Sequence, residues 1–304
     1  MSTTRRTFLK SSALAIAGTA LAANQVLAAS KERTLLGVQL YSVRDDMMKD
    51  ALGTLKQVAA IGYKHVEHAN YVNQKFYGYT AADFKKVLDD LGLKMPSGHT
   101  VMGKNHWDES KKDFTDAWKR TVEDAATVGQ QYVISPWLDD SLRKSMDTLK
   151  HYMDIFNKSG ELCKKSGMKF GYHNHDFEFN TVVDGMLLYD IILQNTDPSL
   201  VAQQMDIGNM YGAGGRPLDI VTKYPGRFEL MHVKDEIDTG KGTMAGGDES
   251  TILGTGLLPV EDIANTFKRD GGTTHFIVEQ ESYQGKTPIE CIKADYDVMR
   301  GWGY

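Results

Sequence analysis

The chain has 304 residues, of which 41% are hydrophobic and 25% charged, a composition typical of a folded globular protein rather than a disordered one. Lys and Arg number 35 against 40 Asp and Glu, so the formal net charge is −5. This balance disfavours a nucleic-acid-binding protein, which needs a basic surface to displace counterions from phosphates. The two cysteines are too few for a disulfide framework or a cysteine-rich zinc site.

The first 28 residues have the pattern of a twin-arginine export signal. Arg5 and Arg6 precede an apolar, alanine-rich run over residues 12–23, and Val26–Ala28 has the small residues that signal peptidase prefers. The apolar run is shorter than the roughly 20 residues that a membrane-spanning helix needs. We therefore expect residues 1–28 to be a cleavable signal peptide and the mature protein to be periplasmic, with no membrane contact.

From residue 34 onward, short apolar runs alternate with amphipathic stretches. The predicted strands are Leu35–Tyr41, Lys64–His68, Lys94–His99, Gln131–Ser135, Lys169–His175, Val201–Asp206, Phe228–Val233 and His275–Glu281. The predicted helices follow them at residues 50–61, 80–91, 109–128, 141–166, 184–194, 217–223, 259–269 and 288–300. Eight strand–helix pairs predict an α/β protein with a single (β/α)₈ TIM barrel over residues 34–304. A doubly wound sheet is the alternative, but no strand is followed by a glycine-rich phosphate loop.

Several local features follow from this division of the chain. Thr80 and Asp108 are predicted to cap the second and third helices. The stretch Glu236–Leu257 is the longest irregular segment, and we expect it to be an active-site loop. Cys163 and Cys291 fall on helices at opposite sides of the barrel, so we expect unpaired thiols that are either in the core or half-buried.

Polar side chains gather where the predicted strands end, which is where the active site of such a barrel lies. They are Glu67, His99, His173, His175, Asp206, His232, Lys234, Glu279 and Glu281. Residues two apart on a strand share a face, so His173 and His175 should point the same way. The same holds for His232 with Lys234 and for Glu279 with Glu281. Oxygen and imidazole ligands without thiolate suit one divalent metal ion, Mn²⁺, Co²⁺, Zn²⁺ or Mg²⁺. Scattered, solvated polar residues are the alternative interpretation.

Five segments of the chain resemble the xylose isomerase-like family of sugar isomerases and epimerases, which includes tagatose 3-epimerase and inosose dehydratase. They are Tyr172–Phe179, Met205–Asn209, His232–Asp235, Leu253–Gly256 and Val278–Glu281. The resemblance implies one divalent metal ion held by Asp206, His232 and Glu279. Its fourth ligand would be His173, where the epimerases have Glu. Whether His173 or His175 is the ligand from the fifth strand stays open.

A metal ion that chelates a ketone and the neighbouring hydroxyl stabilises the enediolate formed when the α-proton is removed, and histidine is the usual base. The candidate acid–base groups are Glu67, His99, His175, Lys234 and Glu279. For Glu67 and His99 the alternative is hydrogen bonding at the barrel mouth. Trp137 follows the fourth strand and is the candidate aromatic platform for a sugar ring.

The resemblance implies a metal-dependent isomerase or epimerase whose partner is a small, non-phosphorylated sugar or keto-sugar. A second hypothesis is a keto-sugar lyase, dehydratase or hydratase acting by β-elimination, for example on 3-keto-glycosides. His173 takes the place of one of the two carboxylates that a two-base epimerase needs. This favours β-elimination, or isomerisation by a same-face proton shift, over epimerisation. A third hypothesis is a sugar-binding barrel without catalysis. The sequence leaves open the substrate, the native metal and whether the protein forms a homo-oligomer.

Overall fold

The structure is a computed structural model and describes residues 34–240, 242 and 247–304. The predicted export signal over residues 1–28 lies outside these residues. Among the described helices, none is both long and apolar enough to cross a membrane.

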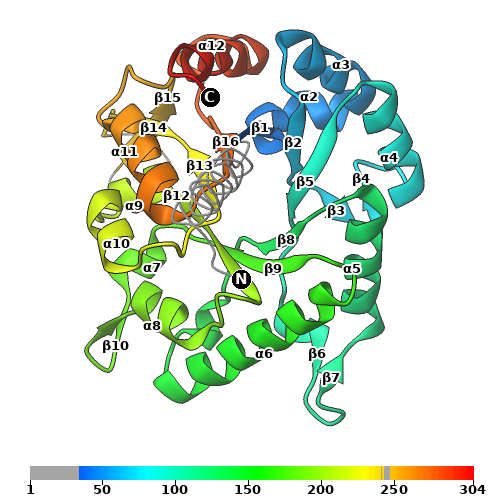
Figure 1. The fold of residues 1–304 in the computed structure, drawn as a ribbon, viewed down its shortest axis with the longest axis vertical. Coiled ribbons are helices and arrows are strands. Elements are labelled where there is room, and N and C mark those ends of the chain that lie inside the picture. The colour runs from blue at the N-terminus through cyan, green and yellow to red at the C-terminus, as the bar shows by residue number, and fades with distance from the viewer. Residues whose placement is uncertain (1–33, 241, 243–246) are drawn as a thin grey trace, which may run out of the picture. The chain divides into compact units, whose positions relative to one another are not determined.

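Eight parallel strands close into a barrel, as predicted (Figure 1). They are β1 (Leu35–Gln39), β2 (His65–His68), β5 (Lys94–His99), β8 (Tyr132–Ser135), β9 (Lys169–His173), β12 (Val201–Asp206), β13 (Leu230–Val233) and β16 (His275–Val278). Pairing of β1 with β16, in which Leu35 lies opposite His275, closes the ring. All six residues of β12 are buried, because helices cover the outer face of a parallel barrel and side chains fill its interior.

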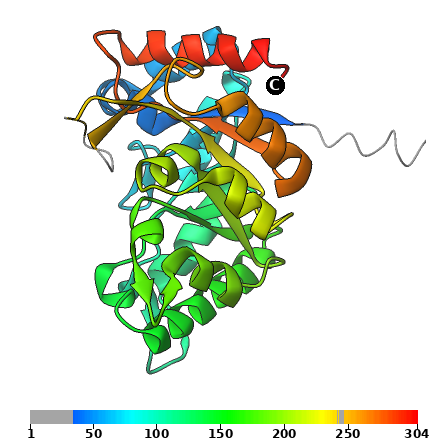
Figure 2. The same cartoon turned by 90° about the vertical axis from the view of Figure 1, so that its left-hand side faces the viewer.

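Helices surround the barrel on its outer side. They are α2 (Arg44–Lys49), α3 (Ala51–Ile61), α4 (Ala81–Asp90), α5 (Asp116–Val128), α6 (Met146–Lys164), α7 (Phe177–Asn180), α8 (Leu188–Asn195), α9 (Ile207–Gly212), α10 (Pro217–Lys223), α11 (Val260–Thr266) and α12 (Pro288–Gly301). The last helix, α12, lies beside α3 (Figures 1 and 2). The hydroxyl of Tyr63, just after α3, donates to the carbonyl of Ile292 at 2.8 Å. Cys163 and Cys291 are buried and unpaired, as predicted.

The alternation of side chains along the strands separates an apolar layer from a polar one. Four residues from four strands form an apolar cluster apart from the core between sheet and helices: Ile134, Ala202, Leu230 and Ile277. Two residues further along three of these strands come Gln204, His232 and Glu279, on the same face. The chain therefore fills one layer of the barrel with apolar side chains and directs polar groups toward the carboxyl ends of the strands.

Four short hairpins lie between barrel strands and the helices that follow. They are β3 (Tyr71–Val72) with β4 (Lys75–Phe76), β6 (Trp107–Asp108) with β7 (Asp113–Phe114), β10 (Val182–Val183) with β11 (Met186–Leu187), and β14 (Asp235–Asp238) with β15 (Asp248–Thr251). The last of these corrects the expectation that Glu236–Leu257 is irregular throughout. Strands β14 and β15 pair antiparallel from Asp235 opposite Thr251 to Asp238 opposite Asp248.

The predicted helix over residues 109–128 is wrong in its first seven residues, since α5 begins only at Asp116. Asp108 does not cap this helix. Its Oδ1 atom accepts hydrogen bonds from the backbone N–H groups of Ser110 and Lys111 and so closes a turn in the β6–β7 hairpin. Thr80 does cap α4, because its hydroxyl oxygen accepts from the N–H of Asp83 at 3.2 Å.

Candidate active site and metal centre

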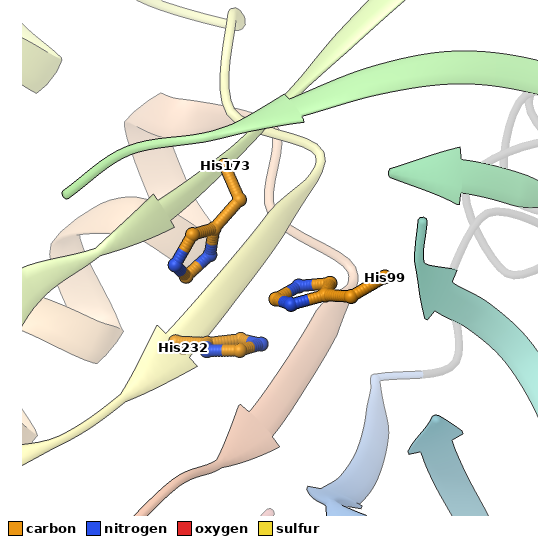
Figure 3. Close-up of side chains that lie close together, drawn as sticks. All are labelled: His99, His173 and His232. Atoms are coloured by element: carbon orange, nitrogen blue, oxygen red, sulfur yellow. The ribbon is translucent and has the colours of Figure 1, made fainter. Parts of the chain in front are cut away.

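Three histidines from three strands turn their rings toward one another at the carboxyl end of the barrel (Figure 3). The ring centre of His173 lies 4.7 Å from that of His99 and 4.6 Å from that of His232. The rings of His99 and His232 are nearly parallel, with centres 5.1 Å apart. The sequence predicted all three as site residues, and the closure of the barrel brings them together.

Glu67, on β2, contacts His99 and His232 and is fully buried. Its Oε1 atom accepts from His232 Nε2 at 2.6 Å and from the Gln39 side chain at 2.7 Å. Its Oε2 atom accepts from the Gln204 side chain at 2.8 Å. Burial would raise the pKa of Glu67, but the neighbouring imidazoles of His99 and His232 hold it well below its usual value. Glu67 is thus a buried anion that orients other side chains, and it does not line the cavity described below.

Gln204 links two of the histidines and settles how their protons are placed. Its Nε2 donates to Glu67, so its Oε1 is the acceptor for His99 Nε2 at 2.6 Å and for His173 Nδ1 at 3.0 Å. His173 therefore carries its proton on Nδ1 and presents an unprotonated Nε2. Burial, together with His232 and His99, holds the pKa of His173 well below its usual value, so this ring is neutral.

A group of carboxylates lies beside His232 on the side away from Glu67. Glu279 Oε2 is 3.0 Å from His232 Nδ1, and Asp206 Oδ2 is 3.8 Å from the same nitrogen. The ammonium of Lys234 lies between these carboxylates, 3.0 Å from Asp206 and 2.8 Å from Glu279, and contacts Glu281 at 2.7 Å. Burial would lower the pKa of His232, but the carboxylates of Glu279 and Glu67 raise it to about 10.

The donor atoms of this group fit a divalent metal ion. Asp206, His232 and Glu279 offer atoms that all lie within 4.8 Å of one another, as do His99, His173 and His232. His232 and His173 each have one ring nitrogen held from outside, by Glu67 and Gln204. Such outer hydrogen bonds orient metal-binding histidines in proteins. The free Nε2 of His173 lies 3.9 Å from Asp206 Oδ2, so the arrangement favours His173 over His175 as the ligand that follows β9.

His175 lies beyond β9 and borders the same site. Its ring centre is 5.1 Å from that of His173, and its Nδ1 atom is buried without a hydrogen-bond partner among the residues that the structure describes. Its backbone N–H donates to the buried carboxylate of Glu178 at 2.9 Å, which fixes the turn after the strand. Burial and the charge of Lys234 lower the pKa of His175 to about 4. The imidazole is thus neutral at pH 7 and able to accept a proton.

A cavity of about 770 Å³ opens above these groups, large enough for a sugar with room to spare. His99, His173, His175, Glu279 and Glu281 line its inner end, together with Asn209. Trp137 and Tyr41 line it further out, and each is about two-fifths exposed. The guanidinium of Arg143 lies 5.3 Å from the centre of the Trp137 ring and holds the indole in place. Among the described residues that line the cavity, none is Lys or Arg.

Gln204 and Glu281 are among the residues of this site to which the sequence analysis assigned no role. Gln204 was passed over although it lies two residues before Asp206 on β12, a spacing that places both side chains on one face. Glu281 was recognised as sharing a face with Glu279 but was not chosen as a site residue, and the structure places it against Lys234 and the cavity. The predicted acid–base roles of Glu67, His99, His175, Lys234 and Glu279 stay predictions.

The chain is similar to known proteins along most of its length. The sequence profile of the xylose isomerase-like TIM barrel family matches residues 55–302. An inosose dehydratase from Clostridium beijerinckii is 27% identical over 226 residues, which are 67% of this chain and 72% of that protein. A solved sugar phosphate isomerase/epimerase from Parabacteroides distasonis is 26% identical with a TM-score of 0.76, covering 88% of this chain and 93% of that one. The IOLI protein, solved with a zinc atom, shares the fold at 14% identity with a TM-score of 0.68, covering 88% and 97%.

Proposed function

The chain belongs to the xylose isomerase-like TIM barrel family, and from that premise we propose that it is a metal-dependent enzyme that removes the α-proton of a small keto-sugar. One observation carries the proposal. His232 and His173 have their outer nitrogens held by Glu67 and Gln204, and they turn the other nitrogen toward the carboxylate group. The zinc atom in the IOLI protein, which shares the fold, is consistent with a metal at such a site.

The metal would be held by four residues: His173, Asp206, His232 and Glu279. A divalent ion at this place supplies an electrophile that stabilises the negative charge of an enediolate. His175 is the base that takes the α-proton, because its neutral imidazole borders the cavity and its buried Nδ1 has no partner among the described residues. Trp137 provides an apolar surface for the sugar ring.

The substrate that we propose is not phosphorylated. A phosphate group is normally bound by Arg, Lys or a helix N-terminus with free N–H groups. The described residues that line the cavity include neither Lys nor Arg, and Glu279 and Glu281 make its inner end acidic. A neutral keto-sugar fits these walls better than a dianion.

We propose β-elimination as the outcome of proton removal, which makes the protein a lyase of the dehydratase type. His175 would take the α-proton and return it to the departing β-oxygen, so that a C–H and a C–O bond break and a C=C bond forms. Water leaves from inosose, and an alcohol leaves from a 3-keto-glycoside. The curated relatives named inosose dehydratase support this choice. His173 stands where the epimerases carry Glu, and its Nδ1 atom is hydrogen-bonded to Gln204. This position therefore lacks the carboxylate that an epimerase would use to move a proton on the second face of the sugar.

Isomerisation or epimerisation is the second candidate, because the similar structure from Parabacteroides distasonis bears the name sugar phosphate isomerase/epimerase. It shares the first step, in which the α-proton is removed, and differs in returning the proton to carbon.

The test is incubation of metal-loaded protein with inosose and with 3-keto-glycosides in D₂O, followed by NMR and ultraviolet absorbance. We expect exchange of the α-proton and an unsaturated ketone that absorbs in the ultraviolet. A deuterium-labelled sugar that keeps all its oxygen atoms and has no such ultraviolet band would assign the isomerase instead. Binding without exchange or product would leave a sugar-binding barrel and contradict the proposal.

A further inference from the structure

Lys234 has an unusual position for a lysine, because its side chain is fully buried among acidic groups. Its ammonium contacts Asp206 at 3.0 Å, Glu279 at 2.8 Å and Glu281 at 2.7 Å. A buried charge is tolerated only when opposite charges and hydrogen bonds compensate for lost hydration. Three carboxylates therefore explain why this lysine can lie in the interior, and the ammonium in turn compensates for them.

The ammonium and a metal ion would use the same two oxygens. Asp206 Oδ2 and Glu279 Oε2 face the Nδ1 atom of His232, and both contact the Lys234 Nζ atom. An ion bound to these oxygens would lie about 2.0–2.2 Å from each. Two cations that share these oxygens would repel each other strongly, because Asp206 and Lys234 are fully buried and water screens them little.

We propose that Lys234 is the resident cation of the metal-free centre and that a divalent ion displaces its ammonium from Asp206 and Glu279 onto Glu281. The inference rests on the metal centre of the proposed function. Metal binding must then break the existing contacts of Lys234 with Asp206 and Glu279. The protein therefore binds metal more weakly than the same four ligands would without the lysine. The same event delivers the ammonium to a carboxylate that lines the cavity.

The structure provides a place for the displaced ammonium. Glu281 already contacts it, and the side chain of Glu281 is 30% exposed whereas that of Glu279 is 7% exposed. The stem of Lys234 passes over Gly208, where an added Cβ atom would lie 2.6 Å from the Lys234 Cδ atom. The absence of a side chain at Gly208 leaves space for the stem, which is unbranched and can change rotamer.

Charge also favours movement of the ammonium over its loss from the site. The described carboxylates that contact His232 or Lys234 are Glu67, Asp206, Glu279 and Glu281, all at least partly buried. Glu236 is also buried nearby, but burial raises its pKa to about 9, so it adds no negative charge at pH 7. A divalent ion together with the ammonium carries three positive charges against these four negative ones. Both cations can therefore be held at once, provided that they use different oxygens.

The experiment measures Zn²⁺ and Mn²⁺ binding by isothermal titration calorimetry on protein first stripped with a chelator. We expect Lys234→Met to bind each ion at least about tenfold more tightly than the wild type, because loss of a buried partner raises the free energy of the metal-free state. Lys223→Met is the matched control, since Lys223 also pairs with a carboxylate, Asp190, but on the surface of α10. Its affinity for metal should equal that of the wild type.

A second variant keeps the lysine, so it tests the inference even if Lys234→Met does not fold. Glu281→Gln removes the carboxylate that receives the ammonium, so we expect weaker metal binding than in the wild type. We also expect metal to raise the melting temperature of Lys234→Met more than that of the wild type. A crystal structure with metal should show Lys234 Nζ beyond hydrogen-bond distance of Asp206 and Glu279 but still against Glu281.

Suppose that the wild type binds metal and that folded Lys234→Met binds it equally or more weakly. This result would overturn the present inference but leave the metal centre intact. The same holds for a metal-bound structure in which the ammonium still contacts Asp206 and Glu279. Failure of every variant and the wild type to bind either ion would overturn the metal centre and this inference together.

Discussion

The Nε2 atom of His232 lies 2.6 Å from Oε1 of Glu67, and both side chains are fully buried. Because Glu67 is ionised and can only accept, the proton of this hydrogen bond sits on His232 Nε2. The opposite nitrogen, Nδ1, is thereby aimed at Glu279 and Asp206.

This pair predicts that Glu67→Gln weakens divalent metal binding about 10–100-fold, as loss of an outer partner of a metal-bound histidine does elsewhere. The measurement is calorimetry on chelator-treated protein. Glu229→Gln is the control, because Glu229 accepts from Lys169 at 2.6 Å and from Tyr132 at 2.9 Å and contacts none of the proposed metal ligands. An unchanged metal affinity in Glu67→Gln would show that this carboxylate does not orient His232 for metal.

His175→Ala should slow turnover of a keto-sugar by about 10²–10⁴-fold if the imidazole is the general base. Exchange of the α-proton with D₂O should slow in parallel, since the same group removes it. His151→Ala provides the control, as His151 is exposed and contacts Glu109. If turnover and exchange survive in His175→Ala, the base is another residue.

Trp137→Ala should raise KM about three- to tenfold and change kcat less, because an aromatic face contributes roughly 0.5–1.5 kcal/mol beyond burial. The indole lines the cavity and is 42% exposed, so its loss leaves the core intact. Leu257→Ala, at an exposed residue outside the lining, should leave both constants unchanged. A loss confined to kcat would contradict a role as a platform for the sugar.

Asp295→Asn should change the pH dependence of stability. Asp295 on α12 accepts from the N–H of Leu253 at 2.9 Å, and burial raises its pKa from 3.8 to about 7. Between these values the unfolded chain has lost a proton that the folded chain keeps, so this group lowers stability as pH rises. The variant should therefore melt at the same temperature as the wild type near pH 4 and at a higher temperature above pH 7. The melting temperature should rise by roughly 2–4 °C for each kcal/mol gained in the free energy of unfolding.

The control for this prediction is Asp297→Asn on the same helix, where the carboxylate is exposed and pairs with Lys293. It should lower the melting temperature only slightly, as surface ion pairs contribute little. A constant difference between Asp295→Asn and the wild type from pH 4 to 8 would mean that Asp295 does not titrate in this range.

We also propose that the chain is exported by the twin-arginine pathway, from the motif at Arg5 and Arg6. Combined Arg5→Lys and Arg6→Lys substitution should leave the protein in the cytoplasm, as measured by cell fractionation. The single substitution Lys10→Arg, which keeps the pair, should be exported normally. Periplasmic accumulation of the double variant would mean that the segment is not read as such a signal.

The barrel could be predicted from the sequence because each of its units is marked locally. A strand such as β12 is a short buried run, and a helix such as α4 begins at a threonine cap, so periodicity and capping identify both. The period of two along a strand also placed His232 with Lys234 and Glu279 with Glu281, and each pair does meet at the site. The start of α5 was misjudged because Asp108 bonds to its own turn as readily as it would cap a helix.

Contacts between strands far apart in the chain were decided only by the tertiary structure. Glu67 and His232 are 165 residues apart, and nothing in either segment shows which nitrogen the carboxylate takes. Gln204 bridges His99 and His173 because the curvature of the closed barrel brings β5, β9 and β12 to one point. The sequence by itself determined which residue types reach the mouth of the barrel, since alternation is a local property of the chain. The proton, the hydrogen-bond partner and the cation that each of these side chains holds depend on distances that are set only when the barrel closes.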